Sequence, residues 1–118
     1  GICIEEIGVV LLFYSLTNSA KALNWFKKYW EVFETSRNPV AKYHFALGML
    51  KFLELLKDQK TYKMKLSSEF PLYQESGEYQ VQELYQYYNS YAVDFARKLD
   101  QRNQSSYYMD MYDKVVGK

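Results

Sequence analysis

Apolar residues recur at three- and four-residue intervals along most of the chain, which is the pattern of helices with one buried face. Helices are predicted over residues 4–16, 20–34, 38–58, 78–99 and 104–116. Short polar segments at residues 17–19, 35–37 and 100–103 separate neighbouring helices. The pattern therefore predicts an all-α protein.

The segment Asn38 to Asp58 has the clearest helical pattern, and we expect the other helices to pack around it. Asn38 can accept a hydrogen bond from a free backbone N–H, and Pro39 suits the first turn because its missing N–H would be unpaired there anyway. The apolar face is unusually wide and comprises Tyr43, Phe45, Ala46, Met49, Leu50, Phe52, Leu53 and Leu56. Such a helix needs cover on two sides, which makes it a middle layer.

Two further features of this helix are informative. Gly48 in a helix interior costs roughly 1 kcal/mol, so we expect another helix to approach closely at that point. The remaining polar positions form a narrow line of His44, Lys51, Glu54 and Asp58. That line is where the helix is expected to meet solvent or a partner.

Residues 59–77 have an ambiguous pattern. Tyr62, Met64 and Leu66 alternate with lysines as in a strand, yet Tyr62 and Leu66 also fit one face of a helix. We favour a short helix over residues 60–70, followed by an irregular connection from Pro71 to Gly77. A small β-hairpin is the alternative.

Consecutive helices can be paired into three hairpins, whose first helices begin near residues 4, 39 and 78. Such a period is typical of arrays in which neighbouring hairpins bury each other's apolar faces. The chain resembles a tetratricopeptide (TPR)-like repeat. Leu47-Gly48 is similar to the Leu-Gly pair of the repeat's first helix. Ala22 and Phe26 are similar to the small and aromatic positions of the repeat's second helix. Residues 106–116 are similar to the closing helix.

Divergent arrays of this kind are similar to those of the peptide-sensing regulators of Gram-positive bacteria, of the Rap and Rgg type. The resemblance implies antiparallel helical hairpins stacked as a short array that binds a peptide or protein. No helix-turn-helix unit is evident, and no phosphatase residue maps onto this chain. An irregular helical bundle is the alternative fold.

Length and charge narrow the functional classes. The 118 residues suit a single domain over residues 1–118. The chain begins at Gly1 rather than Met, so we expect a tag remnant or a piece of a larger protein. A net charge of +1 provides no general attraction for nucleic acid or membrane. Residues 7–14 are apolar but too short to span a bilayer, and the lone Cys3 fits a cytoplasmic location.

The sequence contains little recognisable chemistry for catalysis. One histidine, one cysteine and scattered carboxylates do not provide the usual spacing of metal ligands, and no phosphate-binding loop occurs. We therefore expect neither a cofactor nor a metal nor enzymatic activity. Lys57, Lys60, Lys63 and Lys65 form a basic cluster. It could contact a nucleic acid, but a solubilising surface is the favoured interpretation.

Tyrosines are concentrated in the predicted third hairpin, where Tyr87 and Tyr91 lie one turn apart. In a stacked array the first helices line the concave surface, so we expect a shared groove lined by His44, Lys51, Tyr87, Asn89 and Tyr91. Tyrosine offers contact area, and asparagine can bond a peptide backbone. The predicted function is non-catalytic binding of a peptide or a partner helix. The alternative is self-association, in which Trp25, Trp30 and the N-terminal helix pack against another copy.

Overall fold

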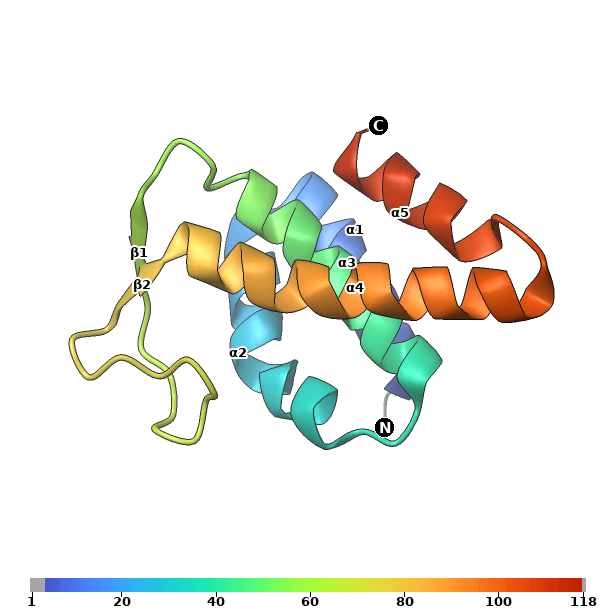
Figure 1. The fold of residues 1–118 in the computed structure, drawn as a ribbon. Coiled ribbons are helices and arrows are strands. Elements are labelled where there is room, and N and C mark those ends of the chain that lie inside the picture. The colour runs from blue at the N-terminus through green and yellow to red at the C-terminus, as the bar shows by residue number, and fades with distance from the viewer. Residues whose placement is uncertain (1–3, 118) are drawn as a thin grey trace.

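A computed structural model describes residues 4–117, and this part of the chain folds into five helices and a short antiparallel strand pair (Figure 1). The helices are α1 (Ile4–Thr17), α2 (Ser19–Thr35), α3 (Pro39–Glu54), α4 (Val81–Asn103) and α5 (Tyr107–Val116). The strands are β1 (Thr61–Lys63) and β2 (Glu78–Gln80). The predicted all-α class is confirmed.

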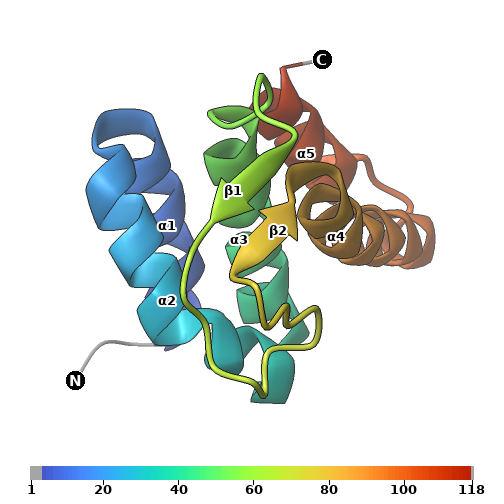
Figure 2. The ribbon, with the colours of Figure 1, turned by 90° about the vertical axis from the view of Figure 1, so that its left-hand side faces the viewer.

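Helix α3 is the middle layer of the fold, as predicted. Figure 2 shows α1 and α2 on one side of α3, and α4 and α5 on the other. Ten residues of α3 are buried, and the helix packs against all four of the others. The predicted cap is also present, because the Asn38 side chain accepts the N–H of Ala41 at 3.1 Å.

Glycines allow α1 and α3 to pack closely. A Cβ atom on Gly8 would collide with the backbone of His44 and Phe45. A Cβ atom on Gly48 would lie 3.0 Å from the carbonyl oxygen of Gly8 and 3.0 Å from the side chain of Leu11. The predicted close approach at Gly48 is confirmed, and the contact is made by α1.

The predicted helix over residues 60–70 is wrong. A hairpin forms, as in the alternative, but its second strand occupies residues 78–80, where a helix was predicted to begin. Strand β1 pairs with β2, with Tyr62 opposite Tyr79. The alternating pattern prevails because it directs Met64 into the core, while Tyr62 packs against Phe52 at a ring distance of 6.2 Å. Without this helix the middle hairpin lacks its second member. Of the two predicted architectures, the stacked array and the helical bundle, the described residues therefore form the bundle.

The predicted break at residues 100–103 is also wrong, since α4 continues to Asn103 and ends at Gln104 in the left-handed conformation. Asp100 explains the difference. Its carboxylate accepts the backbone N–H groups of Tyr108 (3.0 Å) and Met109 (2.9 Å) at the start of α5. Burial raises the pKa of Asp100. These hydrogen bonds lower the pKa by a larger amount, so it lies below its ordinary value. The carboxylate thus serves as the cap of the next helix.

An aromatic cluster fills the space between α2, α3 and α4. Phe26 contacts the rings of Phe45, Phe70 and Tyr88 at centroid distances of 6.0–6.4 Å. Phe33 adds a further contact with Tyr88 at 5.1 Å. Many of the tyrosines and phenylalanines noted in the sequence are therefore used for packing.

Two buried tyrosines of the core differ in one respect that can be tested. The Tyr88 hydroxyl is buried without a hydrogen-bond partner among the described residues, whereas the Tyr43 hydroxyl donates to the Tyr108 carbonyl at 2.6 Å. Tyr88→Phe is expected to leave the free energy of unfolding unchanged or to raise it by about 1 kcal/mol, because it removes an unpaired polar group. Tyr43→Phe is expected to lower it by about 1 kcal/mol. Urea unfolding followed by circular dichroism measures both, and Tyr88→Phe as the less stable variant would contradict the expectation.

Candidate functional site

The candidate site is a groove between α1 and α5, which lie on opposite sides of α3 (Figure 2). It has a volume of about 230 Å³. We call it the α1–α5 groove, and it is lined by Gly8, Val9, Leu12, His44, Leu47, Met111 and Val115. Its floor comes from α3 and its walls from α1 and α5. Apart from His44, every lining side chain is apolar or absent.

One wall of the groove continues as an exposed apolar row on α1. Val9, Phe13 and Leu16 are 52%, 59% and 61% exposed, and Leu12 between them is half-buried. We call these four residues the α1 stripe. They follow the i, i+3, i+4, i+7 spacing of one helix face. Contiguous exposed apolar residues of this kind typically mark a contact surface.

His44 is the polar group of the groove floor. Its side chain is half-buried, and its Nδ1 atom is buried without a hydrogen-bond partner among the described residues. Burial lowers the pKa of His44 below 6.5, although the backbone and the carboxylate of Glu5 oppose this shift. The imidazole is therefore neutral at pH 7. A partner that supplied a matching polar group would relieve the cost of the unpaired nitrogen.

The lowered pKa of His44 predicts a loss of stability on mild acidification. Below pH 6.5 the unfolded chain binds a proton more readily than the folded protein does, so protonation favours unfolding. The melting temperature is expected to fall between pH 7.5 and 5.5, a range in which ordinary carboxylates change little. Because His44 is the only histidine, the His44→Gln variant should lose most of this dependence. Equal pH slopes for the two proteins would rule the expectation out.

The other predicted site residues have intramolecular partners. Lys51 lies about two turns along α3 from His44 and pairs with Glu54 at 3.3 Å. Tyr87 donates to the Glu34 carboxylate of α2 at 2.7 and 2.8 Å, and Tyr91 donates to the Pro39 carbonyl at 3.1 Å.

Asn89 accepts the Tyr112 hydroxyl of α5 at 2.6 Å. These bonds direct the α4 side chains toward three different neighbours: α2, the start of α3, and α5. The structure therefore does not bring the five predicted residues into one groove. It places His44 in the α1–α5 groove and the three α4 residues elsewhere.

Sequence reasoning missed the walls of the groove, which are formed by Val9, Leu12, Met111 and Val115. One signal was present, because α1 is apolar around almost its whole circumference. Such a helix is expected to be fully covered. Only the structure shows that one of its faces is left open.

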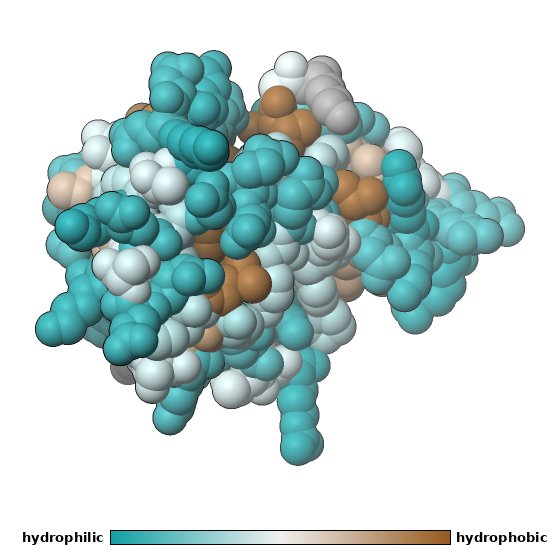
Figure 3. Space-filling model, turned by 60° about the vertical axis from the view of Figure 1, so that its left-hand side comes forward, coloured by the Kyte–Doolittle hydropathy of each residue, from teal (hydrophilic) through white to brown (hydrophobic). Residues whose placement is uncertain are grey.

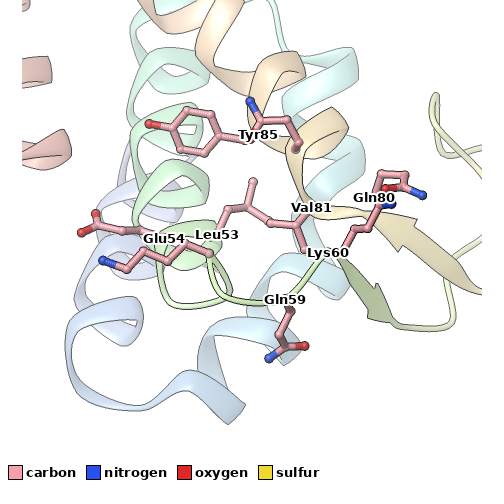
Figure 4. Close-up of a pocket in the computed structure, with 9 residues that line it drawn as sticks. Leu53, Glu54, Gln59, Lys60, Gln80, Val81 and Tyr85 are labelled. Atoms are coloured by element: carbon pink, nitrogen blue, oxygen red, sulfur yellow. The ribbon is translucent and has the colours of Figure 1, made fainter.

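A second, more polar cavity of about 420 Å³ lies where α3 ends and α4 begins (Figure 4). It is lined by Leu53, Glu54, Lys57, Gln59, Lys60, Gln80, Val81, Gln82 and Tyr85. Figure 4 shows the Leu53 and Val81 side chains near its centre, with Tyr85 to one side.

Two lysines of the predicted basic cluster, Lys57 and Lys60, line this cavity. Both are exposed, and solvated charges of this kind bind an anion only weakly. On the face drawn in Figure 3, hydrophilic residues predominate and apolar ones form small patches. The lining of this cavity is therefore more polar than that of the α1–α5 groove.

Among the described residues, no three His, Cys, Asp or Glu side chains are grouped so that they could hold a metal ion. None of the helices over residues 4–117 combines the length and the apolar character needed to cross a membrane. The resemblance to TPR-like regulators stays a prediction. The chain matches no protein-family model, no curated protein and no solved structure.

Proposed function

We propose that this protein is a non-catalytic binding module whose α1–α5 groove receives the apolar face of a helix from a protein partner. The observation that carries the proposal is the uncovered α1 stripe beside a groove floored by His44 and Leu47. The TPR-like relationship and the cytoplasmic location predicted from the sequence stay part of this proposal.

The shape of the groove favours a helix over a small molecule. Two helices flank a third, and the α1 stripe extends the apolar surface along α1, so side chains on a further helix can interdigitate with it. The α1 stripe has the spacing by which one helix contacts another. A volume of about 230 Å³ leaves room for an anchoring side chain of the partner, such as leucine or phenylalanine.

Charge and hydrogen bonding define the partner helix further. Glu5 and Glu6 are both exposed in the first turn of α1. A lysine or arginine at the matching end of the partner would complement them. A polar group near the anchor would pair with Nδ1 of His44. The expected partner is therefore apolar where it contacts the groove and positively charged near one end of that contact.

Selection from a display library of amphipathic helices tests the proposal. Peptides that bind the wild-type protein are expected to share an apolar face. Leu12→Glu is expected to weaken their binding at least about tenfold, because it places a charge on the groove wall. Fluorescence polarisation of labelled peptides gives the dissociation constants.

Leu55→Glu is the matched control, since Leu55 is 50% exposed at the end of α3 and does not line the groove. It is expected to bind the selected peptides like the wild type. The proposal fails if no selected peptide depends on Leu12. It also fails if the two variants lose binding equally.

A further inference from the structure

We infer that the helix received by the α1–α5 groove is α1 of a second copy of this chain, packed antiparallel on the α1 stripe. The inference rests on the proposed function and names its partner.

The α1 stripe is complementary to itself in one arrangement. When two copies of α1 lie antiparallel with Leu12 opposite Phe13, Val9 falls opposite Leu16, and the four stripe positions match one another. Interfaces with twofold symmetry require such a surface, because each copy presents the same residues to the other. No other sequence is needed to cover the stripe.

The charges of α1 select the antiparallel direction. The helix carries Glu5 and Glu6 in its first turn and no basic residue in its last turn. A parallel pair would place four carboxylates side by side. In the antiparallel pair, Glu5 and Glu6 lie near the end of the other copy's α1, where α2 begins with its positive N-terminal end. The exposed Lys21 lies in the same turn.

The tryptophans proposed for self-association from the sequence are occupied within the chain. Trp30 is only 6% exposed. The indole N–H of the half-buried Trp25 donates to the Ile7 carbonyl at 2.9 Å. Of the surfaces predicted to pair two copies, the N-terminal helix alone presents a continuous apolar row. The row is short compared with the roughly 800 Å² that each partner buries in a standard interface. The dimer is therefore expected to be weak and concentration-dependent.

Sedimentation equilibrium over a range of protein concentrations tests the pairing. The wild type is expected to change from monomer to dimer as its concentration rises. Phe13→Glu is expected to weaken the dimer at least about tenfold, because it places a charge at the centre of the interface. Tyr107→Glu is the matched control, because Tyr107 is 63% exposed, similar to Phe13, but lies on α5 outside the stripe. It should dimerise like the wild type.

Charge reversal and cross-linking test the direction of the two helices. The double variant Glu5→Lys, Glu6→Lys is expected to weaken the dimer, and the added change Lys21→Glu is expected to restore part of it. In a Cys3→Ser background, an equal mixture of the Val9→Cys and Leu16→Cys variants should form disulfide-linked dimers. Either variant alone should not, because only the antiparallel register brings positions 9 and 16 within disulfide distance.

The outcomes separate this inference from the proposed function. If the protein stays monomeric at every concentration while groove-dependent peptides bind it, the inference is wrong and the proposed function stands. A dimer that is unaffected by Phe13→Glu, or that cross-links position 9 to position 9, also overturns the inference. If the monomer binds no groove-dependent peptide, both are wrong.

Discussion

Gly8→Ala is expected to lower the free energy of unfolding by about 3 kcal/mol, even though alanine is the better helix former. The added methyl group would overlap the backbone of His44 and Phe45. Backbone atoms cannot rotate away as a side chain can, so α1 and α3 have to separate. That separation would expose the apolar contact that holds α1 on the middle layer. Urea unfolding followed by circular dichroism measures the loss.

Gly48→Ala provides a graded comparison for Gly8→Ala. Its nearest neighbours are the Gly8 carbonyl and the Leu11 side chain, both at 3.0 Å. Because Leu11 can adjust in part, a smaller loss is expected than at Gly8. A Gly8→Ala variant as stable as the wild type would show that α1 does not pack on α3 as described.

Phe26→Ala is expected to lower the free energy of unfolding by about 3–5 kcal/mol, the usual cost of deleting a buried phenylalanine ring. Phe26 is fully buried and contacts rings from α3, α4 and the connection between the strands. The cavity left behind would lie between these elements and remove contacts from each. Urea unfolding gives the magnitude.

Phe26→Leu keeps most of the apolar volume and is expected to cost about 1 kcal/mol. Hydrogen exchange adds a local readout for Phe26→Ala. The Phe70 N–H, which donates to Ser67 at 3.0 Å, should exchange faster because Phe70 loses its edge-to-face contact. The packing described for this cluster would be wrong if Phe26→Ala and Phe26→Leu were equally stable.

The sequence by itself determined the features that depend on near neighbours along the chain. Helix periodicity located all five helices, although α3 ends at Glu54 rather than Asp58 and α4 begins at Val81. The Asn38-Pro39 pair marked the start of α3. The width of the apolar face identified α3 as the middle layer. Gly48 indicated a close helix contact, because a glycine within a helix is costly unless something requires the space.

The tertiary structure alone decided the features that depend on residues distant in the sequence. Tyr62 lies in a strand because Tyr79 pairs with it across the connecting loop. The spacing of apolar residues near Tyr62 in the sequence does not reveal that pairing. In the sequence, Asp100 looks like part of a polar break between two helices. In the structure, α5 folds back, and the N–H groups at its start donate to the Asp100 carboxylate. The directions of Tyr87, Asn89 and Tyr91 follow in the same way from the packing of α4 against three different neighbours.

The α1–α5 groove illustrates the same division. Its residues come from the two ends of the chain and from α3 between them. The sequence showed that α1 is apolar and that His44 belongs to the polar line of α3. Whether a helix covers a given apolar face depends on where distant helices pack, and α5 leaves the α1 stripe open. The sequence therefore determined which surfaces are apolar, and the tertiary structure decided which of them remain exposed.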